Sequence, residues 1–414
     1  MKRTAAVALM AGSLIAGFGV QPVAARPSGS LLLPASDPFY RAPASLGSYP
    51  PGAIIRERSV HVSLPGGVPL ADTTAYQLLY RTSDGYGADV ANVTTVIVPD
   101  GSKPAAGRTL VSLQDAEDSL TTNCAASYQL QIGERDNSDL LAEFTAIVPA
   151  LLATGHVLVI PDPEGPKSEM WVRTAEAHEV LDSVRAAEQF APAQLDGVRT
   201  RVALAGYSGG GNETMAAAEL QPSYAGKLDV VAVAAGGSVV NDRAGDDYLD
   251  ANASGAVMGA MIGLQRALPS LGWSRLLNAD GRKVARIETG GSGCVSPVVS
   301  ERQHIQDWSD VPDPLGVPRI ARAIAHDALG HLTPQAPTML YISTHDQLIL
   351  PAGQDRLASF YCRHGAQLDY IRDPAPYLGD DHILAALGGF IPRALSYIDQ
   401  GLSGHKLPDT CGQR

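Results

Sequence analysis

Short, largely apolar runs alternate with helical patterns along most of this chain, and this alternation restricts the possible folds. Runs rich in β-branched residues lie at 59–64, 76–81, 93–99, 109–113, 156–161, 202–205, 230–234, 337–343 and 368–371. The later runs are almost entirely apolar, as strands buried on both faces must be. Helical patterns occur at 171–189, 215–220 and 383–397. The order predicts an α/β fold with a mostly parallel central sheet.

One long segment, 241–332, breaks the alternation. It holds an apolar helical stretch at 253–271, several prolines and glycines, and no clear strand pattern. We therefore expect an inserted, mainly helical cap at 241–332, flanked by the two parts of the core at 26–240 and 333–414. The alternative is a set of ordinary helices that pack on the sheet.

The N-terminus has the pattern of an export signal. Lys2 and Arg3 precede an apolar run at 5–20, and small residues follow as far as Ala25. This pattern predicts a secretory signal peptide at 1–25 that is cut after Ala25, and hence a secreted, extracellular protein. An uncleaved anchor is the alternative, but the run is short for a membrane span, so we expect no transmembrane segment in the mature chain.

The composition narrows the class of protein. Of the 414 residues, 45% are hydrophobic and 18% are charged, which is typical of a globular chain with a large core. The formal net charge of -12 argues against nucleic acid as a partner, because a polyanion requires a basic surface. The oligomeric state cannot be derived from these features.

The four cysteines are Cys124, Cys294, Cys362 and Cys411. An even number in an exported chain predicts two disulfide bonds, and the sequence alone allows three pairings. No two cysteines are close together in the sequence, so a zinc site built on a CxxC motif is not indicated.

The candidate nucleophile is Ser208, in the segment Gly206-Tyr207-Ser208-Gly209-Gly210. A buried strand pattern precedes this GxSxG motif and a helix of small and apolar residues follows it, which is the setting of a nucleophile elbow. The tight turn favours Gly206 and Gly210, because a Cβ atom would clash there. The alternative is a tight strand-to-helix turn with an idle serine. With antiparallel early strands and parallel later ones, the motif suits an α/β-hydrolase fold.

A serine hydroxyl needs a base, and the base needs an acid to orient it. In this fold the acid and then the histidine follow the serine along the chain. Asp346 lies just after the apolar strand at 337–343, at the end of the sheet where active-site groups gather. Asp355, in a predicted helix, and Asp327, in the predicted cap, are weaker alternatives.

Three histidines follow Asp346, namely His364, His382 and His405. His364 lies at a predicted helix C-terminus, where a capping role suffices, and His405 lies in the tail. His382 lies in a loop between the last strand and a helix, which is where the base belongs. We therefore expect Ser208, Asp346 and His382 to form a catalytic triad.

An oxyanion hole needs two hydrogen-bond donors. The backbone N–H of Gly209, directly after the nucleophile, is one candidate. The second is expected in the loop that follows the strand at 109–113, where the sequence is acidic and an HGGG motif is absent. The residues alone do not distinguish among Asp115, Glu117 and Asp118.

Several short motifs, in this order, resemble the secretory lipase family of fungi and actinobacteria, the yeast lipase A type. The matching segments span most of the mature chain: Asp37-Pro38-Phe39-Tyr40, Glu117-Asp118-Ser119 ahead of Cys124-Ala125-Ala126-Ser127-Tyr128, Pro161-Asp162-Pro163-Glu164-Gly165, Gly206-Tyr207-Ser208-Gly209-Gly210, Ala234-Ala235-Gly236-Gly237 and His382.

The resemblance implies an α/β-hydrolase with an inserted cap that hydrolyses acylglycerols and related long-chain esters through an acyl-enzyme, at a lipid–water interface. It implies that Asp118 joins Gly209 in the oxyanion hole. It also implies that Cys124 pairs with Cys294 and Cys362 with Cys411. No metal or other cofactor is expected.

The resemblance has limits. Only three residues follow Cys411, so a C-terminal flap like that of the yeast enzyme has little sequence to form it, and the region 241–332 matches least well. An ester hydrolase is therefore the firmer prediction and a triacylglycerol lipase the finer one. The alternatives are a short-chain carboxylesterase, an acyltransferase or a peptidase with the same triad, and a non-catalytic binding protein on this fold.

Overall fold

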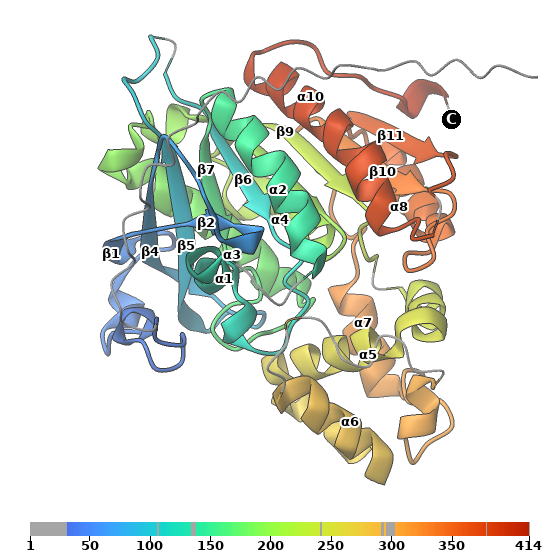
Figure 1. Ribbon diagram of the computed structural model, residues 1–414. Helices are drawn as coiled ribbons and strands as arrows, with labels where there is room; N and C mark the ends of the chain where they lie inside the picture. Colours follow the sequence, from blue (N-terminus) through green and yellow to red (C-terminus); the bar gives the residue numbers. More distant parts are fainter. Residues whose placement is uncertain are drawn as a thin grey trace, which may run out of the picture. The chain divides into compact units, whose positions relative to one another are not determined.

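A nine-stranded sheet organises the described part of the chain (Figure 1). The computed structural model describes residues 31–105, 107–133, 138–240, 242–290, 294, 303–377 and 379–413. Within these, Leu33 onward belongs to one compact unit that ends at Arg414. The predicted signal peptide at 1–25 lies outside the described residues.

The strands follow the spatial order β1-β4-β5-β7-β6-β8-β9-β10-β11. The pairings β1–β4, β4–β5 and β5–β7 are antiparallel, and all the remaining pairings are parallel. The bounds are β1 (Ile54–Val60), β4 (Thr73–Ser83), β5 (Asp89–Pro99), β6 (Leu110–Gln114), β7 (Val157–Pro161), β8 (Arg201–Tyr207), β9 (Asp229–Gly236), β10 (Thr338–Ser343) and β11 (Leu368–Asp373). The predicted mostly parallel α/β sheet is confirmed.

Helices cover both faces of this sheet (Figure 1). Their bounds are α1 (Ala126–Ile132), α2 (Ser138–Ala153), α3 (Arg173–Gln189), α4 (Gly209–Tyr224), α8 (Pro351–Arg363), α9 (Ile383–Ala385) and α10 (Ile391–Leu402). Strand residues alternate between two cores. In β8, Val202 and Leu204 pack with α3 and α4, whereas Ala203 and Ala205 pack with α2 and α10. This two-sided burial explains why the central strands are apolar throughout.

The predicted strand at 59–64 is wrong as a single element. The structure has β1 at Ile54–Val60 and a separate short strand β2 (Ser63–Leu64), which pairs with β3 (Val68–Pro69) in a second small sheet. β1 lies at the edge of the main sheet and is only partly buried. An edge strand needs few apolar residues, so its apolar pattern is weak.

The described residues between β9 and β10 are helical. They form α5 (Arg243–Ala267), α6 (Ala279–Gly290) and α7 (Pro318–Asp327), with short 3₁₀ turns between them. Apart from one isolated bridge between Leu277 and Ser309, these residues contribute no strand pairing. The boundaries of a cap at 241–332 stay a prediction.

Two disulfide bonds tie distant segments together. Cys124 pairs with Cys294, 170 residues away, and Cys362 of α8 pairs with Cys411 near the C-terminus. This is the pairing that the family resemblance implied. Among the described residues, no helix is both long enough and apolar enough to cross a membrane.

Candidate active site

Ser208 lies on a sharp turn between β8 and α4. Its backbone has φ 56° and ψ -124°, a conformation that costs free energy for any residue with a Cβ atom. The turn is held by two backbone hydrogen bonds, from Ser208 N–H to the Gly236 carbonyl at 2.9 Å and from Asn212 N–H to the Ser208 carbonyl at 3.0 Å. The strain is the geometry expected of a nucleophile elbow.

The glycines beside Ser208 are required by close packing. A Cβ atom on Gly206 would overlap the Gly210 backbone, and one on Gly210 would overlap the carbonyl of Gln114 in β6. The elbow therefore fits tightly against the neighbouring strand, in agreement with the crowding expected from the sequence.

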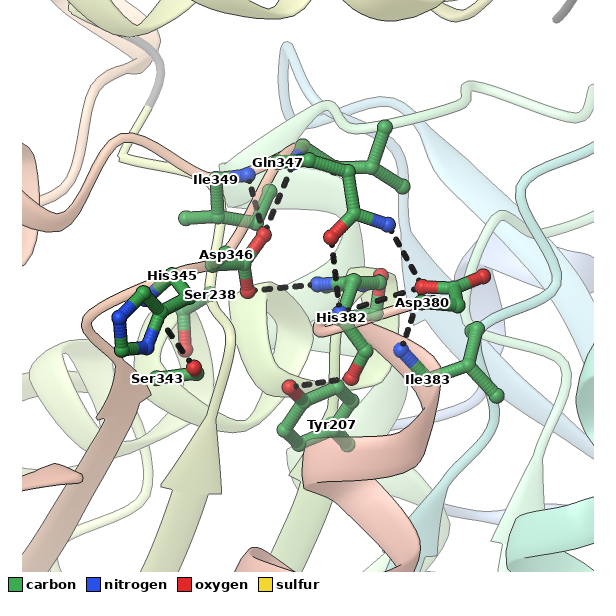
Figure 2. Close-up of polar contacts among 12 residues, drawn as sticks. Tyr207, Ser238, Ser343, His345, Asp346, Gln347, Ile349, Asp380, His382 and Ile383 are labelled. Atoms are coloured by element: carbon green, nitrogen blue, oxygen red, sulfur yellow. Dashed lines mark hydrogen bonds and ion pairs between the residues drawn. The ribbon is translucent and has the colours of Figure 1, made fainter. Parts of the chain in front are cut away.

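His382 lies between the candidate nucleophile and the candidate acid. Its Nε2 atom is 2.8 Å from Ser208 Oγ, and its Nδ1 atom is 2.8 Å from Asp346 Oδ2. Figure 2 shows His382 and Asp346 facing each other across two loops at the carboxyl ends of the strands. The side chains of both residues are almost completely buried. The fold thus brings together the three residues that chain order predicted.

Asp346 is held by its own loop. Its Oδ1 atom accepts hydrogen bonds from the N–H groups of Leu348 at 2.9 Å and Ile349 at 2.8 Å, which leaves Oδ2 directed at His382 (Figure 2). Tyr248 of α5 donates its hydroxyl to the Asp346 carbonyl at 2.8 Å. These bonds fix the carboxylate orientation that a triad acid needs.

A second set of bonds joins the loop of Asp346 to the loop of His382 (Figure 2). Gln347 Oε1 accepts from His382 N–H at 3.0 Å, and Gln347 Nε2 donates to Asp380 Oδ1 at 2.6 Å. Asp380 Oδ1 also accepts from the N–H groups of His382 and Ile383, each at 3.1 Å. No sequence motif marks Gln347 or Asp380, so their part in joining the two loops could not be predicted.

The alternative acids and bases make other contacts. Asp355 accepts from Tyr370 Oη at 2.9 Å and lies near Arg372, while Asp327 accepts from Arg173 N–H at 3.2 Å. His364 is exposed and contacts the Phe360 carbonyl within its own helix. His405 is exposed in the C-terminal tail.

Asp118 lies against the residue that follows the nucleophile. A Cβ atom on Gly209 would overlap the carboxyl group of Asp118, and Asp118 has a positive φ of 42°. Trp171 Nε1 donates to Asp118 Oδ1 at 2.6 Å, which orients that carboxyl group. Asp115 and Glu117 are both buried. The structure therefore places Asp118 beside Gly209, where the sequence left three candidates open.

The range that matches a known family includes Ser208, Asp346 and His382. A family model described as "Secretory lipase" matches residues 135–410 of this chain. The chain belongs to the secretory lipase family. Family membership supports a hydrolase that acts on esters.

Relatives of this chain carry differing names. "Probable inactive lipase MT1628" of Mycobacterium tuberculosis is 32% identical over 91% of this chain and 84% of its own length. "Secreted triacylglycerol lipase LIP2" of Malassezia furfur is 30% identical over 83% of this chain and 74% of its own length. Candida antarctica lipase A in its closed state is 26% identical, with a TM-score of 0.81 over 93% of this chain and 90% of that chain. The α/β-hydrolase fold is thereby confirmed.

Buried carboxyl groups surround the elbow of this member of the secretory lipase family. Glu164 lies near the Ser119 N–H at 3.3 Å, and Glu176 accepts from Asn212 Nδ2 at 2.7 Å. Burial, and then the neighbouring acidic groups, raise the pKa of Glu117, Glu164, Glu176 and Glu213 well above the usual value. Burial therefore favours the neutral form of each of these carboxyl groups. Sequence reasoning missed this cluster, although Glu213 stands among small and apolar residues just after the elbow.

A pocket lies beside Trp171. Its wall consists of apolar side chains of α5 and Ile324 of α7, together with the carboxyl groups of Asp246 and Asp327. Trp171 also donates to Asp118, so the pocket lies on the Asp118 side of the candidate site. No group of His, Cys, Asp and Glu side chains within the described ranges is arranged to hold a metal ion.

Proposed function

We propose that this protein is a secreted serine ester hydrolase in which Ser208, His382 and Asp346 are the catalytic triad. The observation that carries the proposal is the position of His382, whose two ring nitrogens lie 2.8 Å from Ser208 Oγ and 2.8 Å from Asp346 Oδ2. A base within hydrogen-bond reach of the nucleophile, itself oriented by an acid, is the arrangement that activates serine.

The proposed reaction is an acyl-enzyme cycle. His382 takes the proton of Ser208 as Oγ attacks the ester carbonyl, and Asp346 stabilises the imidazolium that forms. The N–H groups of Gly209 and Asp118 stabilise the oxyanion. His382 then protonates the leaving alcohol, and water repeats the sequence on the acyl-enzyme.

We propose acylglycerols as the substrate class. The pocket beside Trp171 has a mainly apolar wall, as an acyl chain requires, and Trp171 in that wall donates to the proposed oxyanion residue Asp118. A Malassezia furfur relative named a secreted triacylglycerol lipase supports the same class. In this proposal the segment 241–332 is a cap, and its helix α5 lines the acyl site.

Secretion is part of the proposal. The export pattern at 1–25, with cleavage after Ala25, supports it, as do the two disulfide bonds and the relatives named as secreted. Disulfide bonds persist in oxidising, extracellular surroundings.

The test is hydrolysis of p-nitrophenyl esters from acetyl to palmitoyl, with Ser208→Ala as the matched control. The proposal predicts rates that rise toward long chains and are lost in the variant. Activity limited to esters with short acyl chains would be consistent with the proposed triad but would make the protein a short-chain carboxylesterase. Equal activity of the variant would contradict the assignment of Ser208. Added alcohols test for acyl transfer.

A further inference from the structure

The acyl pocket proposed above is apolar except at two points, and both are carboxyl groups. Asp246 lies on α5 and Asp327 lies at the end of α7, and each contributes to the pocket wall. An acyl chain that fills this pocket would cover both groups. The protonation state of the two carboxyl groups therefore decides whether the acyl chain packs against a neutral acid or against a charged carboxylate.

The Asp246 carboxyl group has an oxygen without a partner. Oδ2 is buried and accepts no hydrogen bond among the described residues. Asp242, Arg243 and Asp247 at the start of α5 interact with it electrostatically. Arg243 opposes the rise in the pKa of Asp246, but it also forms ion pairs with Asp247 and Asp313.

Burial is the main reason that the pKa of Asp246 rises to about 7, and the nearby Asp242 and Asp247 carboxylates add to it. An unpaired carboxyl group in an apolar wall favours its neutral form. At mildly acidic pH, Asp246 therefore presents a neutral acid to the pocket.

The Asp327 carboxyl group is only 7% exposed, and its Oδ2 atom accepts from the N–H of Arg173 at the start of α3. Its electrostatic neighbours come from three elements: Arg173 and Glu176 of α3, Glu169 of the preceding loop, and Tyr86 between β4 and β5. Burial raises the pKa of Asp327 to about 7, although Arg173 opposes the rise.

Packing an alkyl chain against an ionised carboxylate removes the water that solvates the charge, whereas packing it against a neutral acid costs far less. We propose, on the basis of the proposed ester hydrolase function, that Asp246 and Asp327 determine acyl-chain selectivity: the pocket accepts long alkyl chains while both carboxyl groups are protonated and disfavours them when either ionises. The preferred substrates at acidic pH are then long-chain esters.

The experiment compares two substrates in one enzyme. We would measure kcat/KM for p-nitrophenyl laurate and p-nitrophenyl butyrate from pH 5 to pH 9. Any effect of pH on the triad acts on both esters, so the ratio of kcat/KM for laurate to that for butyrate reports on the pocket. The ratio should fall about tenfold or more as pH rises through 7, because the carboxyl groups lose their protons there.

The matched variant is Asp246→Asn/Asp327→Asn, which keeps the shape of both side chains and an oxygen that can accept from Arg173 N–H. Its ratio should stay at the acidic wild-type value at every pH. If the double variant does not fold, Asp246→Asn alone tests the inference. This substitution should not disturb folding, since Asp246 Oδ2 has no hydrogen bond to lose among the described residues. That variant should remove a measurable part of the pH dependence.

Two results would overturn the inference. One is a wild-type ratio that does not change with pH, and the other is a ratio that falls equally in the wild type and the variants. In both cases hydrolysis of butyrate persists and the proposed ester hydrolase stands. Failure to hydrolyse either ester at any pH would instead contradict the proposed function itself.

Discussion

At the scale of single residues, Gln347 connects the two loops that carry the proposed acid and base. It accepts from the N–H of His382 and donates to Asp380, so it links the turn after β10 to the turn after β11 (Figure 2). The two hydrogen bonds of the Gln347 side chain go to the His382 backbone N–H and to Asp380, not to Ser208 Oγ or the His382 ring. Its effect on the reaction would come through the position of His382, since small misplacements of a catalytic group lower rates strongly.

Replacing Gln347 tests this positioning role. Gln347→Ala should lower kcat about tenfold while KM and Tm change little, because the triad contacts loosen but the substrate pocket is untouched. Gln347→Glu keeps the acceptor for His382 N–H but places a second carboxylate beside Asp380, so it should rescue only part of the rate. Steady-state kinetics separates the two parameters. A rise in KM at constant kcat would rule out positioning.

The three residues of the proposed triad could be named from the sequence because chain order and loop position restrict the candidates. Ser208, Asp346 and His382 each follow a recognisable strand. The proposal of Asp118 over Asp115 and Glu117 could not be made from the residues alone, because it rests on a local turn with positive φ at Asp118 and on Trp171, which lies 53 positions further along the chain. Gln347 and Asp380 likewise act through contacts between loops that are distant in sequence.

At the scale of elements, α5 lies unusually close to the loop that carries Trp171. A Cβ atom on Gly263 would overlap the backbone of Met170, and one on Gly259 would lie 2.7 Å from Met170 Sδ. Glycine at these positions of α5 lets the helix approach the loop. The approach keeps Trp171 at the wall of the pocket and in contact with Asp118.

The substitution Gly263→Ala should push α5 away from Met170. Overpacking of this kind costs about 1–3 kcal/mol in the free energy of unfolding, and we expect the rate on long-chain esters to fall more than the rate on butyrate. The matched control is Gly290→Ala at the exposed end of α6, where an added Cβ meets no atom within 4 Å. Equal effects of the two substitutions, measured by denaturation and by chain-length profiles, would disprove this role for α5.

Strands could be predicted from the sequence where both faces of the strand are buried. The central strands are apolar on both faces and were found, whereas β1 at the sheet edge was misplaced and α1 and α2 were not expected. Helices that cover one face of a sheet carry a mixed pattern, which polar loop residues easily obscure. The helical nature of the described residues between β9 and β10 agrees with the missing strand pattern, but their packing depends on contacts such as Gly263 with Met170.

At the scale of the whole molecule, the described part of the protein buries several glutamate side chains. Glu117, Glu164, Glu176, Glu179 and Glu213 all have a pKa raised well above the usual value, chiefly by burial. In the unfolded chain these groups release their protons near pH 4.5, whereas the folded state retains them. Unfolding therefore becomes more favourable as pH rises above about 4.5, and the stabilising contribution is lost toward the higher folded pKa.

Glu213 provides the clearest test, because neither of its carboxyl oxygens has a hydrogen-bond partner among the described residues. Glu213→Gln should raise Tm at pH 8 by several degrees and change it much less near pH 4.5, since only the acid pays for ionisation. The exposed Glu57→Gln in β1 controls for removing one negative charge from a chain of net charge -12. Calorimetry at the two pH values would refute this account if the benefit of Glu213→Gln were the same at both.

The most direct test of the central claim is active-site labelling with a fluorophosphonate, followed by mass spectrometry of the digested protein. The proposed triad predicts one adduct per chain, located on Ser208, no adduct in Ser208→Ala, and greatly slowed labelling in His382→Ala. An adduct on another serine, or no labelling of the folded wild-type protein, would contradict the assignment of Ser208 as an activated nucleophile.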